Sequence, residues 1–275
     1  MISLITVTYN AERTLGRTLE SVSRQSQRGF EHVIIDGASK DGTMALVEAY
    51  ATENTDIKVI SVSEPDKGLY DAMNKGLAKA SGDYVCFLNA GDKLHDADTL
   101  YYINKIAERA GTPAPAVIYG ETDIVDDKGQ FIRHRRLSSP EKLTWKSFRH
   151  GMVVCHQSFY ALRSLATPYD LTYRFSADFD WCVRLMKAGA EKGYPMVNSH
   201  KILTDYLSEG MTTQNHKASL KERFRIMSKH YGWLVTAAMH GWFVLRSILY
   251  KLGIRKPWSS ECRLKTSFHS AENSV

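Results

Sequence analysis

The amino-acid sequence predicts an α/β fold with a mostly parallel sheet flanked by helices. Two observations support this prediction. Short runs rich in Val, Ile and Leu alternate with amphipathic segments of helical periodicity along residues 1–92. The apolar runs also end in polar, turn-rich segments that lead into helices. A β-α order of this kind builds right-handed crossovers and a parallel sheet.

Four strands are predicted in the first part of the chain. A helical pattern follows each of the first three, as with Leu15, Leu19 and Val22 after the first strand. The second helix opens near Met44, and the third spans residues 69–80. The predicted strands occupy residues 2–7, 32–35, 58–62 and 84–88.

The second part of the chain is less regular. Strands are predicted at residues 116–120, 130–136, 152–160 and 202–207, and a helix opens between Phe175 and Trp181. The run 130–136 ends in a basic cluster, Arg133-His134-Arg135-Arg136. This cluster either contacts a phosphate group or belongs to a solvent-exposed edge strand, whose charges prevent pairing with a further strand.

The composition bounds the class of protein. The chain has 275 residues, 43% of them hydrophobic, which suits one large α/β domain with appendages. Its cysteines are scattered without a C-x-x-C pair, which argues against a zinc site or a disulfide framework and for a reducing compartment. The N-terminus opens directly with a strand, so we expect no secretion signal.

Positive charge is concentrated near the C-terminus. The net charge is +6, but residues 217–256 alone hold nine Lys and Arg against one acidic residue, Glu222. An apolar stripe with helical spacing runs from Leu220 to Leu252. Its uncharged part, 233–245, is shorter than the roughly 20 residues that span a bilayer. We expect a basic amphipathic helix on an anionic membrane surface; a helix packed on the domain or in a homodimer interface is the alternative.

Polar segments follow all four strands of the first part. The carboxyl ends of parallel strands meet at one edge of a sheet, so we expect a polar ligand there. The sequence has no G-x-G-x-x-G and no P-loop motif, which speaks against a dinucleotide or P-loop site. Taken alone, the segment from Asn89 to Asp92 is a turn in which Asp92 caps a helix, but the neighbouring strand ends favour a ligand site.

Several ordered motifs resemble those of glycosyltransferase family 2. They are T-V-T-Y-N at residues 6–10, D-G-A-S-K-D-G-T at 36–43 and G-D-Y-V-C-F-L-N-A-G-D at 82–92. The run from Ser63 to Gly76 resembles a bacterial polysaccharide subgroup, as in colanic-acid, capsule and O-antigen pathways. The resemblance covers roughly residues 1–215 and implies a GT-A-type, Rossmann-like fold.

On this basis the chain divides into four parts. Residues 1–100 are the expected nucleotide-sugar-binding half and residues 101–215 the acceptor and catalytic half of one domain. Residues 216–256 form the C-terminal amphipathic helical extension, and residues 257–275 are expected to be a disordered tail.

The resemblance implies an inverting transfer of a sugar from a nucleotide-sugar, here a UDP-sugar, to a hydroxyl of a glycan or lipid-linked acceptor. We expect the protein in the cytoplasm, peripheral to the inner face of the membrane. Asp36 would contact the base, since a carboxylate accepts the ring N–H of uracil. The residues expected to bind the nucleotide are Thr6, Tyr9, Asn10, Asp36, Asp66, Lys67, Asn89 and Gly91.

Asp92 is the expected metal ligand. The family pattern at this position is commonly D-x-D-D, whereas this chain has Asn89 and Gly91 where carboxylates are common. One Asp together with two diphosphate oxygens and waters suffices for Mg²⁺, so the expected cofactor is one divalent cation, Mg²⁺ or Mn²⁺.

Asp178 is the expected general base. It resembles the acidic residue that opens a helix in the family, and an ionised carboxylate takes a proton from a hydroxyl that is positioned well. Asp180 fits a helix-opening charge better than a catalyst. His156 and Gln157 resemble a pair that faces the acceptor, although a single His on a strand is more often structural.

Two other functions stay open at this stage. The reduced metal motif is compatible with a catalytically inactive nucleotide-sugar-binding or scaffold protein of the same fold, against which the retained Asp178 argues. The pI of 9.0 is compatible with a nucleic-acid-binding protein. Because the charge is confined to one segment, we expect no nucleic-acid partner.

Overall fold

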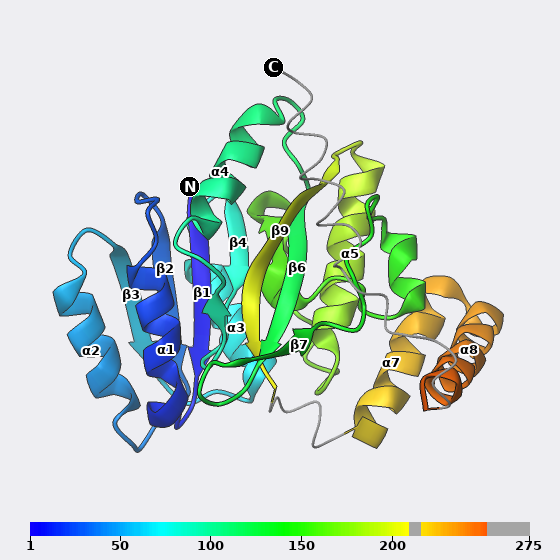
Figure 1. The fold of residues 1–275 in the computed structure, drawn as a ribbon, viewed down its shortest axis with the longest axis horizontal. Coiled ribbons are helices and arrows are strands. Elements are labelled where there is room, and N and C mark those ends of the chain that lie inside the picture. Colours follow the sequence, from blue (N-terminus) through cyan, green and yellow to red (C-terminus); the bar gives the residue numbers. More distant parts are fainter. Residues whose placement is uncertain (209–215, 252–275) are drawn as a thin grey trace.

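Four parallel strands form one half of the sheet. The computed structural model describes residues 1–208 and 216–251 of the chain. In it, the order of these strands is β3-β2-β1-β4 (Figure 1), and all their pairings are parallel, as predicted. Their carboxyl ends therefore face one edge of the sheet. The bounds are β1 (Ile2–Thr8), β2 (Glu31–Asp36), β3 (Lys58–Ser63) and β4 (Tyr84–Phe87).

The other half of the sheet mixes strand directions. Strand β8 pairs antiparallel with both β4 and β6, β6 pairs parallel with β9, and the short strands β5 and β7 pair antiparallel with β9 and β6. Because β4 and β6 both oppose β8, β6 and β9 run in the direction of β1 and end at the same edge. The bounds are β5 (Lys93–Leu94), β6 (Val117–Val125), β7 (Phe131–His134), β8 (Phe159–Leu162) and β9 (Met196–Leu207).

Helices cover both faces of this sheet. Leu4 and Ile34 pack with α1, α2 and α4 on one face, whereas Ile5 and Val33 pack with α3 and α5 on the other. Both faces of β1 are thus buried, which explains its continuous apolar run. The bounds are α1 (Glu12–Ser23), α2 (Thr43–Glu53), α3 (Leu69–Lys79), α4 (Thr99–Arg109) and α5 (Ala177–Glu191).

The strand predicted at residues 152–160 is wrong over most of its length. A 3₁₀ turn, η2 (His156–Ser158), replaces it, and the Ser158 N–H donates to the Cys155 carbonyl at 3.0 Å. Strand β8 begins only at Phe159. The turn lets three consecutive polar side chains reach different buried partners, which the two faces of a strand would not permit. Two further 3₁₀ segments flank it, η1 (Trp145–His150) and η3 (Arg163–Leu165).

The C-terminal segment forms two helices and not the single helix that its stripe suggested. Helices α7 (His216–Tyr231) and α8 (Trp233–Lys251) meet at Gly232, whose φ of 86° lies in the left-handed region that ends a helix. Ile226 and Met227 of α7 are fully buried in the core, and α7 lies against α5 (Figure 1). Helix α7 is therefore part of the domain.

One expectation about the end of the chain, the disordered tail at 257–275, lies outside the described residues. In the part of the chain that the structure does describe, none of the helices combines the length and the hydropathy that crossing a membrane requires.

Candidate functional site

Asp36 occupies the end of β2 with no exposed surface. Its Oδ2 accepts hydrogen bonds from the Ser39 N–H at 2.9 Å and from the Ser63 hydroxyl at 2.6 Å, and its Oδ1 accepts one from the Ser39 hydroxyl. Ser63 ends the neighbouring strand β3. The carboxylate is thus held rigidly at the edge where the parallel strands end.

Three strand ends meet beside Gly37. A Cβ at this position would lie 2.5 Å from Asp66 Oδ2 and 3.2 Å from Tyr9 Cδ2, so only glycine permits their approach. Tyr9 is 64% exposed, and Lys67 is exposed as well. Asn10 connects the loops after β1 and β2, because its Oδ1 accepts a hydrogen bond from the Lys40 N–H at 2.9 Å. The structure therefore brings these predicted nucleotide-binding residues together.

Thr6 does not share this position. Its side chain is fully buried inside the sheet, where the hydroxyl donates to the Leu88 carbonyl at 2.7 Å and lies 2.9 Å from His32 Nε2. The expectation that Thr6 frames the ligand pocket is corrected accordingly, because the hydroxyl has no path to a ligand.

The backbone geometry of the turn after β4 explains why Gly91 stands where the family commonly has a carboxylate. Gly91 has a φ of 102°, and a Cβ on it would lie 2.8 Å from Leu207 Cδ2. A carboxylate at this position would be strained as well as crowded. The hydroxyl of Thr18 in α1 fixes the turn through two hydrogen bonds. It accepts one from the Gly91 N–H at 2.9 Å and donates one to the Asp92 carbonyl at 2.6 Å.

Asp92 is 4% exposed and accepts one hydrogen bond on each carboxylate oxygen. The Leu207 N–H donates to Oδ1 and the Gln157 side-chain amide donates to Oδ2, both at 3.0 Å. Burial raises the pKa of Asp92 to about 7, against the lowering effect of these bonds and of Arg17. Gln157, expected to face the acceptor, instead positions Asp92.

The turn fits a hard divalent cation. Asn89 Oδ1 is buried and has no hydrogen-bond partner among the residues described. An amide oxygen is a suitable ligand for Mg²⁺ or Mn²⁺, and each oxygen of Asp92 keeps a second lone pair. Asn89 and Asp92 are therefore the residues that would hold such an ion.

Asp178 lies in the first turn of α5. Its Oδ1 accepts hydrogen bonds from the Phe179 N–H at 2.9 Å and from the Tyr70 hydroxyl at 3.1 Å. Asp92 accepts a hydrogen bond from the Leu207 N–H at 3.0 Å, next to Tyr206 at the end of β9. Burial raises the pKa of Tyr206, and the charges of Asp92 and Asp178 both raise it further.

His156 is a core residue, which corrects its placement on the acceptor side. It is 4% exposed, stacks on Phe87 with ring centres 5.1 Å apart, and its Nε2 lies 2.7 Å from the Tyr169 hydroxyl. Burial lowers the pKa of His156 to about 4, so the imidazole is neutral near pH 7. It packs with Phe87 and Tyr169 in the core of the domain.

Asp180 has the structural role expected of it. It is fully buried, and although burial raises its pKa, hydrogen bonds from His230 and Arg184 bring the pKa down to about 2. The contact with His230 Nε2, at 2.8 Å, ties α5 to α7.

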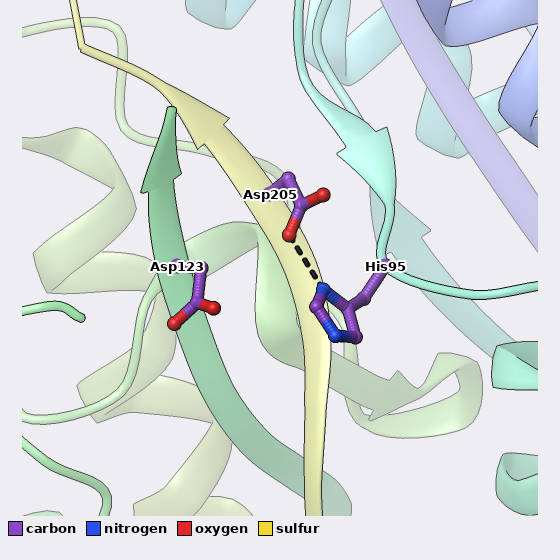
Figure 2. A group of neighbouring side chains, drawn as sticks. All are labelled: His95, Asp123 and Asp205. Atoms are coloured by element: carbon purple, nitrogen blue, oxygen red, sulfur yellow. Dashed lines mark hydrogen bonds and ion pairs between the residues drawn. The ribbon is translucent and has the colours of Figure 1, made fainter. Parts of the chain in front are cut away.

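A second group of side chains could hold a cation on the opposite face of the sheet from α5. Asp123 and Asp205 are register partners on β6 and β9, and His95 follows β5 (Figure 2). His95 Nδ1 lies 2.6 Å from Asp205, and this bond raises the pKa of His95. Lys93 and His134 also pair with the two carboxylates, so protein side chains already bind oxygens of this group.

Comparison with known proteins decides the family. A sequence model described as "Glycosyl transferase family 2" matches residues 3–167. This chain belongs to glycosyltransferase family 2. A PGL/p-HBAD biosynthesis glycosyltransferase of Mycobacterium bovis is 34% identical over 188 residues, which cover 67% of this chain and 69% of the relative. The amylovoran biosynthesis glycosyltransferase AmsB of Erwinia amylovora is 28% identical over 212 residues, with 73% and 69% covered.

Solved structures of glycosyltransferases share the fold of this family member. S. aureus TarS 1–349 in complex with UDP-GlcNAc superposes with a TM-score of 0.62 at 17% identity, covering 82% of this chain and 65% of that one. The chain thus spans less than two thirds of the TarS fragment. The mannosyltransferase PcManGT of Pyrobaculum calidifontis, in complex with GDP-Man and Mn²⁺, has a TM-score of 0.63 at 16% identity, with 99% and 81% covered.

Sequence reasoning about this glycosyltransferase missed two contacts. Tyr70 lies in the run from Ser63 to Gly76, but nothing in that run indicates a bond to Asp178, 108 residues away. The placement of Gln157 against Asp92 was also missed, because His156 and Gln157 were expected to face the acceptor from a strand and lie instead in a 3₁₀ turn.

Proposed function

We propose that this protein transfers a sugar, with inversion, from a nucleotide-sugar to a hydroxyl group in bacterial cell-surface glycan synthesis. The observation that carries the proposal is the bond from the Leu207 N–H to Asp92 at 3.0 Å, beside Tyr206, whose pKa the charges of both Asp92 and Asp178 raise. In the proposal Asp92 acts on the donor's diphosphate and Asp178 on the acceptor hydroxyl.

Asp178 is the proposed general base. The Tyr70 hydroxyl and the Phe179 N–H bind one carboxylate oxygen and leave the other to accept the proton of the acceptor hydroxyl. The acceptor oxygen attacks the anomeric carbon from the face opposite the leaving group, so the bond to the diphosphate breaks as the new glycosidic bond forms. A divalent cation held at Asn89 and Asp92 would neutralise charge on the diphosphate.

UDP is the proposed nucleotide of the donor. Tyr9, Asn10 and Asp36 lie at the ends of β1 and β2. A bound base would replace a serine partner of the buried Asp36 carboxylate and donate its ring N–H there. The two solved glycosyltransferases bind UDP-GlcNAc and GDP-Man, so both bases belong in the test.

The decisive experiment is a screen of UDP- and GDP-sugars for binding and turnover, with Mg²⁺ or Mn²⁺ and with EDTA. We expect one UDP-sugar to be consumed and the product to have the anomeric configuration opposite to the donor, as read by NMR. Binding without any turnover across a panel of glycan and lipid-linked acceptors would favour the alternative of an inactive nucleotide-sugar-binding protein. Retention of configuration would contradict the mechanism.

We also propose that α8 contacts an anionic membrane surface, where a lipid-linked acceptor would be found. Trp233, Leu234, Val244, Leu245 and Ile248 are exposed on this helix, between 47% and 77% of their surface. The basic residues of the C-terminal segment suit anionic headgroups, and aromatic and aliphatic side chains suit the interface. A homodimer interface on α8 is the competing outcome.

A further inference from the structure

Hydrogen bonds connect helix α7 to the residues just before α5, close to Asp178 in the sequence. Glu222 accepts hydrogen bonds from the backbone N–H groups of Arg174 and Phe175, at 2.6 and 2.7 Å. The hydroxyls of Ser219 and Ser176 lie 3.2 Å apart. These contacts fix the position of the residue that follows Glu222 in the helix, Arg223.

Arg223 is half-buried and lies beside Phe179. Its guanidinium carbon lies 5.6 Å from the centre of the Phe179 ring, one residue beyond Asp178. Its Nε is buried and makes no hydrogen bond with the described residues. Burial lowers the pKa of Arg223, while the charge of Asp178 raises it. A buried N–H donor without a partner is costly, so its retention here points to an anion from outside the chain.

Arg135 approaches the same place from the other side. It follows β7 and is half-buried, and its guanidinium makes one long hydrogen bond of 3.4 Å to the Leu137 carbonyl. Its backbone N–H donates to the Thr122 carbonyl at 3.1 Å, and the Thr122 hydroxyl lies 2.7 Å from that of Ser158, which follows the Gln157 that holds Asp92. The charge of Arg135 also lowers the pKa of Arg223. Among the described residues neither arginine forms an ion pair with a carboxylate.

We propose that Arg135 and Arg223 bind the diphosphate of the donor and stabilise the charge that develops on the leaving nucleoside diphosphate. Two guanidinium groups repel each other unless an anion lies between them, and their planar forks bind phosphate oxygens in pairs. Arg223 lies beside the residue that follows Asp178, and Arg135 is linked through Thr122 and Ser158 to the segment that holds Asp92, so an anion bound by both arginines would lie near both carboxylates. This inference rests on the proposed function. It also explains how the charge of the diphosphate is neutralised although the turn after β4 has a single carboxylate, Asp92.

A phosphate on a lipid-linked acceptor has the same chemistry. We assign the site to the donor because Arg135 is on the Asp92 side: its N–H donates to the Thr122 carbonyl, and Thr122 bonds Ser158 next to the Gln157 that holds Asp92. Soluble probes without a lipid separate the two sources.

The test is calorimetric titration of the full chain with UDP, GDP, inorganic pyrophosphate and uridine, in Mg²⁺ and in EDTA. We expect Arg135→Gln and Arg223→Gln each to weaken binding of pyrophosphate and the preferred nucleoside diphosphate at least tenfold, and to leave uridine binding unchanged. Matched controls are Arg136→Gln, an exposed neighbour of Arg135, and Arg225→Gln, an exposed residue of the same helix. Both controls should bind within twofold of wild type.

Arg223→Lys keeps the charge but loses the planar guanidinium group that binds two phosphate oxygens, so it should weaken diphosphate binding by an intermediate factor. It also keeps the test valid if Arg223→Gln does not fold. Wild-type affinity for diphosphates in Arg135→Gln and Arg223→Gln would overturn the inference while leaving the proposed function intact. Weaker binding of a phosphate-bearing acceptor alone would overturn the assignment to the donor. If the wild-type protein binds neither UDP nor GDP, the proposed function itself fails.

Discussion

Gln157 donates a hydrogen bond from its side-chain amide to Asp92 Oδ2, at 3.0 Å, in a site where both residues are almost fully buried. The same amide group accepts a bond from the Cys155 thiol through Oε1, at 3.0 Å, which sets its orientation. Gln157 therefore holds a carboxylate whose burial would otherwise favour the neutral form even more strongly.

Substitution of Asp92 tests the cation site. We expect Asp92→Ala to abolish the increase in nucleoside diphosphate affinity that Mg²⁺ or Mn²⁺ provides, because the turn loses its one carboxylate. Asn89→Ala should reduce that increase only in part, since an amide oxygen is a weaker ligand than a carboxylate. Titration calorimetry with and without EDTA measures both. An affinity for UDP or GDP that still responds to the cation in Asp92→Ala would remove Asp92 from the site.

Substitution of Asp178 tests the general base. Asp178→Asn should lower the transfer rate by on the order of 10²–10⁴, the usual contribution of general base catalysis, and change nucleotide affinity less than twofold. Tyr70→Phe should lower the rate by less, because it removes one bond that orients the base. Single-turnover assays with the donor identified in the screen provide the rates. Turnover at the wild-type level in Asp178→Asn contradicts the assignment.

The buried histidines predict instability on the acid side. Burial lowers the pKa of His32 to about 3 and of His156 to about 4, against 6.5 in an unfolded chain. Between pH 6.5 and 4 these histidines bind more protons in the unfolded state, so their contribution to stability is complete above pH 6.5 and falls as the pH drops. Asp92, whose pKa is raised to about 7, contributes in the opposite direction over this range. Each imidazole contributes a slope of about 1.4 kcal/mol per pH unit at most.

Denaturant unfolding at pH 4.5, 5.5, 6.5 and 7.5 measures this slope. His156→Gln should show a shallower dependence than the wild-type protein over the same range, because one of the two titrating groups is gone. An equal slope in the variant would mean that another group dominates acid unfolding.

Exposed residues of α8 test the membrane contact. We expect Leu234→Ser with Leu245→Ser to lower binding to phosphatidylglycerol-containing liposomes roughly tenfold, since each leucine contributes on the order of 1 kcal/mol of apolar burial. Leu171→Ser, a half-exposed leucine outside α8, serves as the matched control. Removal of all residues after 216 is unsuitable, because Ile226 and Met227 belong to the core.

Sedimentation with liposomes, together with light scattering of the free protein, separates the two possible uses of α8. Unchanged liposome binding in the double variant would exclude α8 as the membrane contact. Loss of a dimer in solution, without loss of lipid binding, would assign the helix to a homodimer interface.

Local patterns predicted the parallel half of the sheet correctly because β1, β2 and β4 are buried on both faces and the helices between the strands carry apolar stripes. The segment at 152–160 shows where this reasoning fails. Its apolar residues suggested a strand, but three adjacent polar side chains found buried partners through a turn. The stripe after Leu220 likewise gave no sign that Gly232 divides it into two helices.

The sequence alone determined the order of the βα units, the polar ends of the strands and the family to which those motifs belong, because these features depend on residues close together in the chain. Tertiary structure decided which groups meet at the site. Tyr70 reaches Asp178 across 108 residues, Gln157 reaches Asp92 across 65, and Arg223 stands beside Phe179 only because α7 docks on α5. Such contacts depend on how separate elements dock, and no local periodicity encodes that.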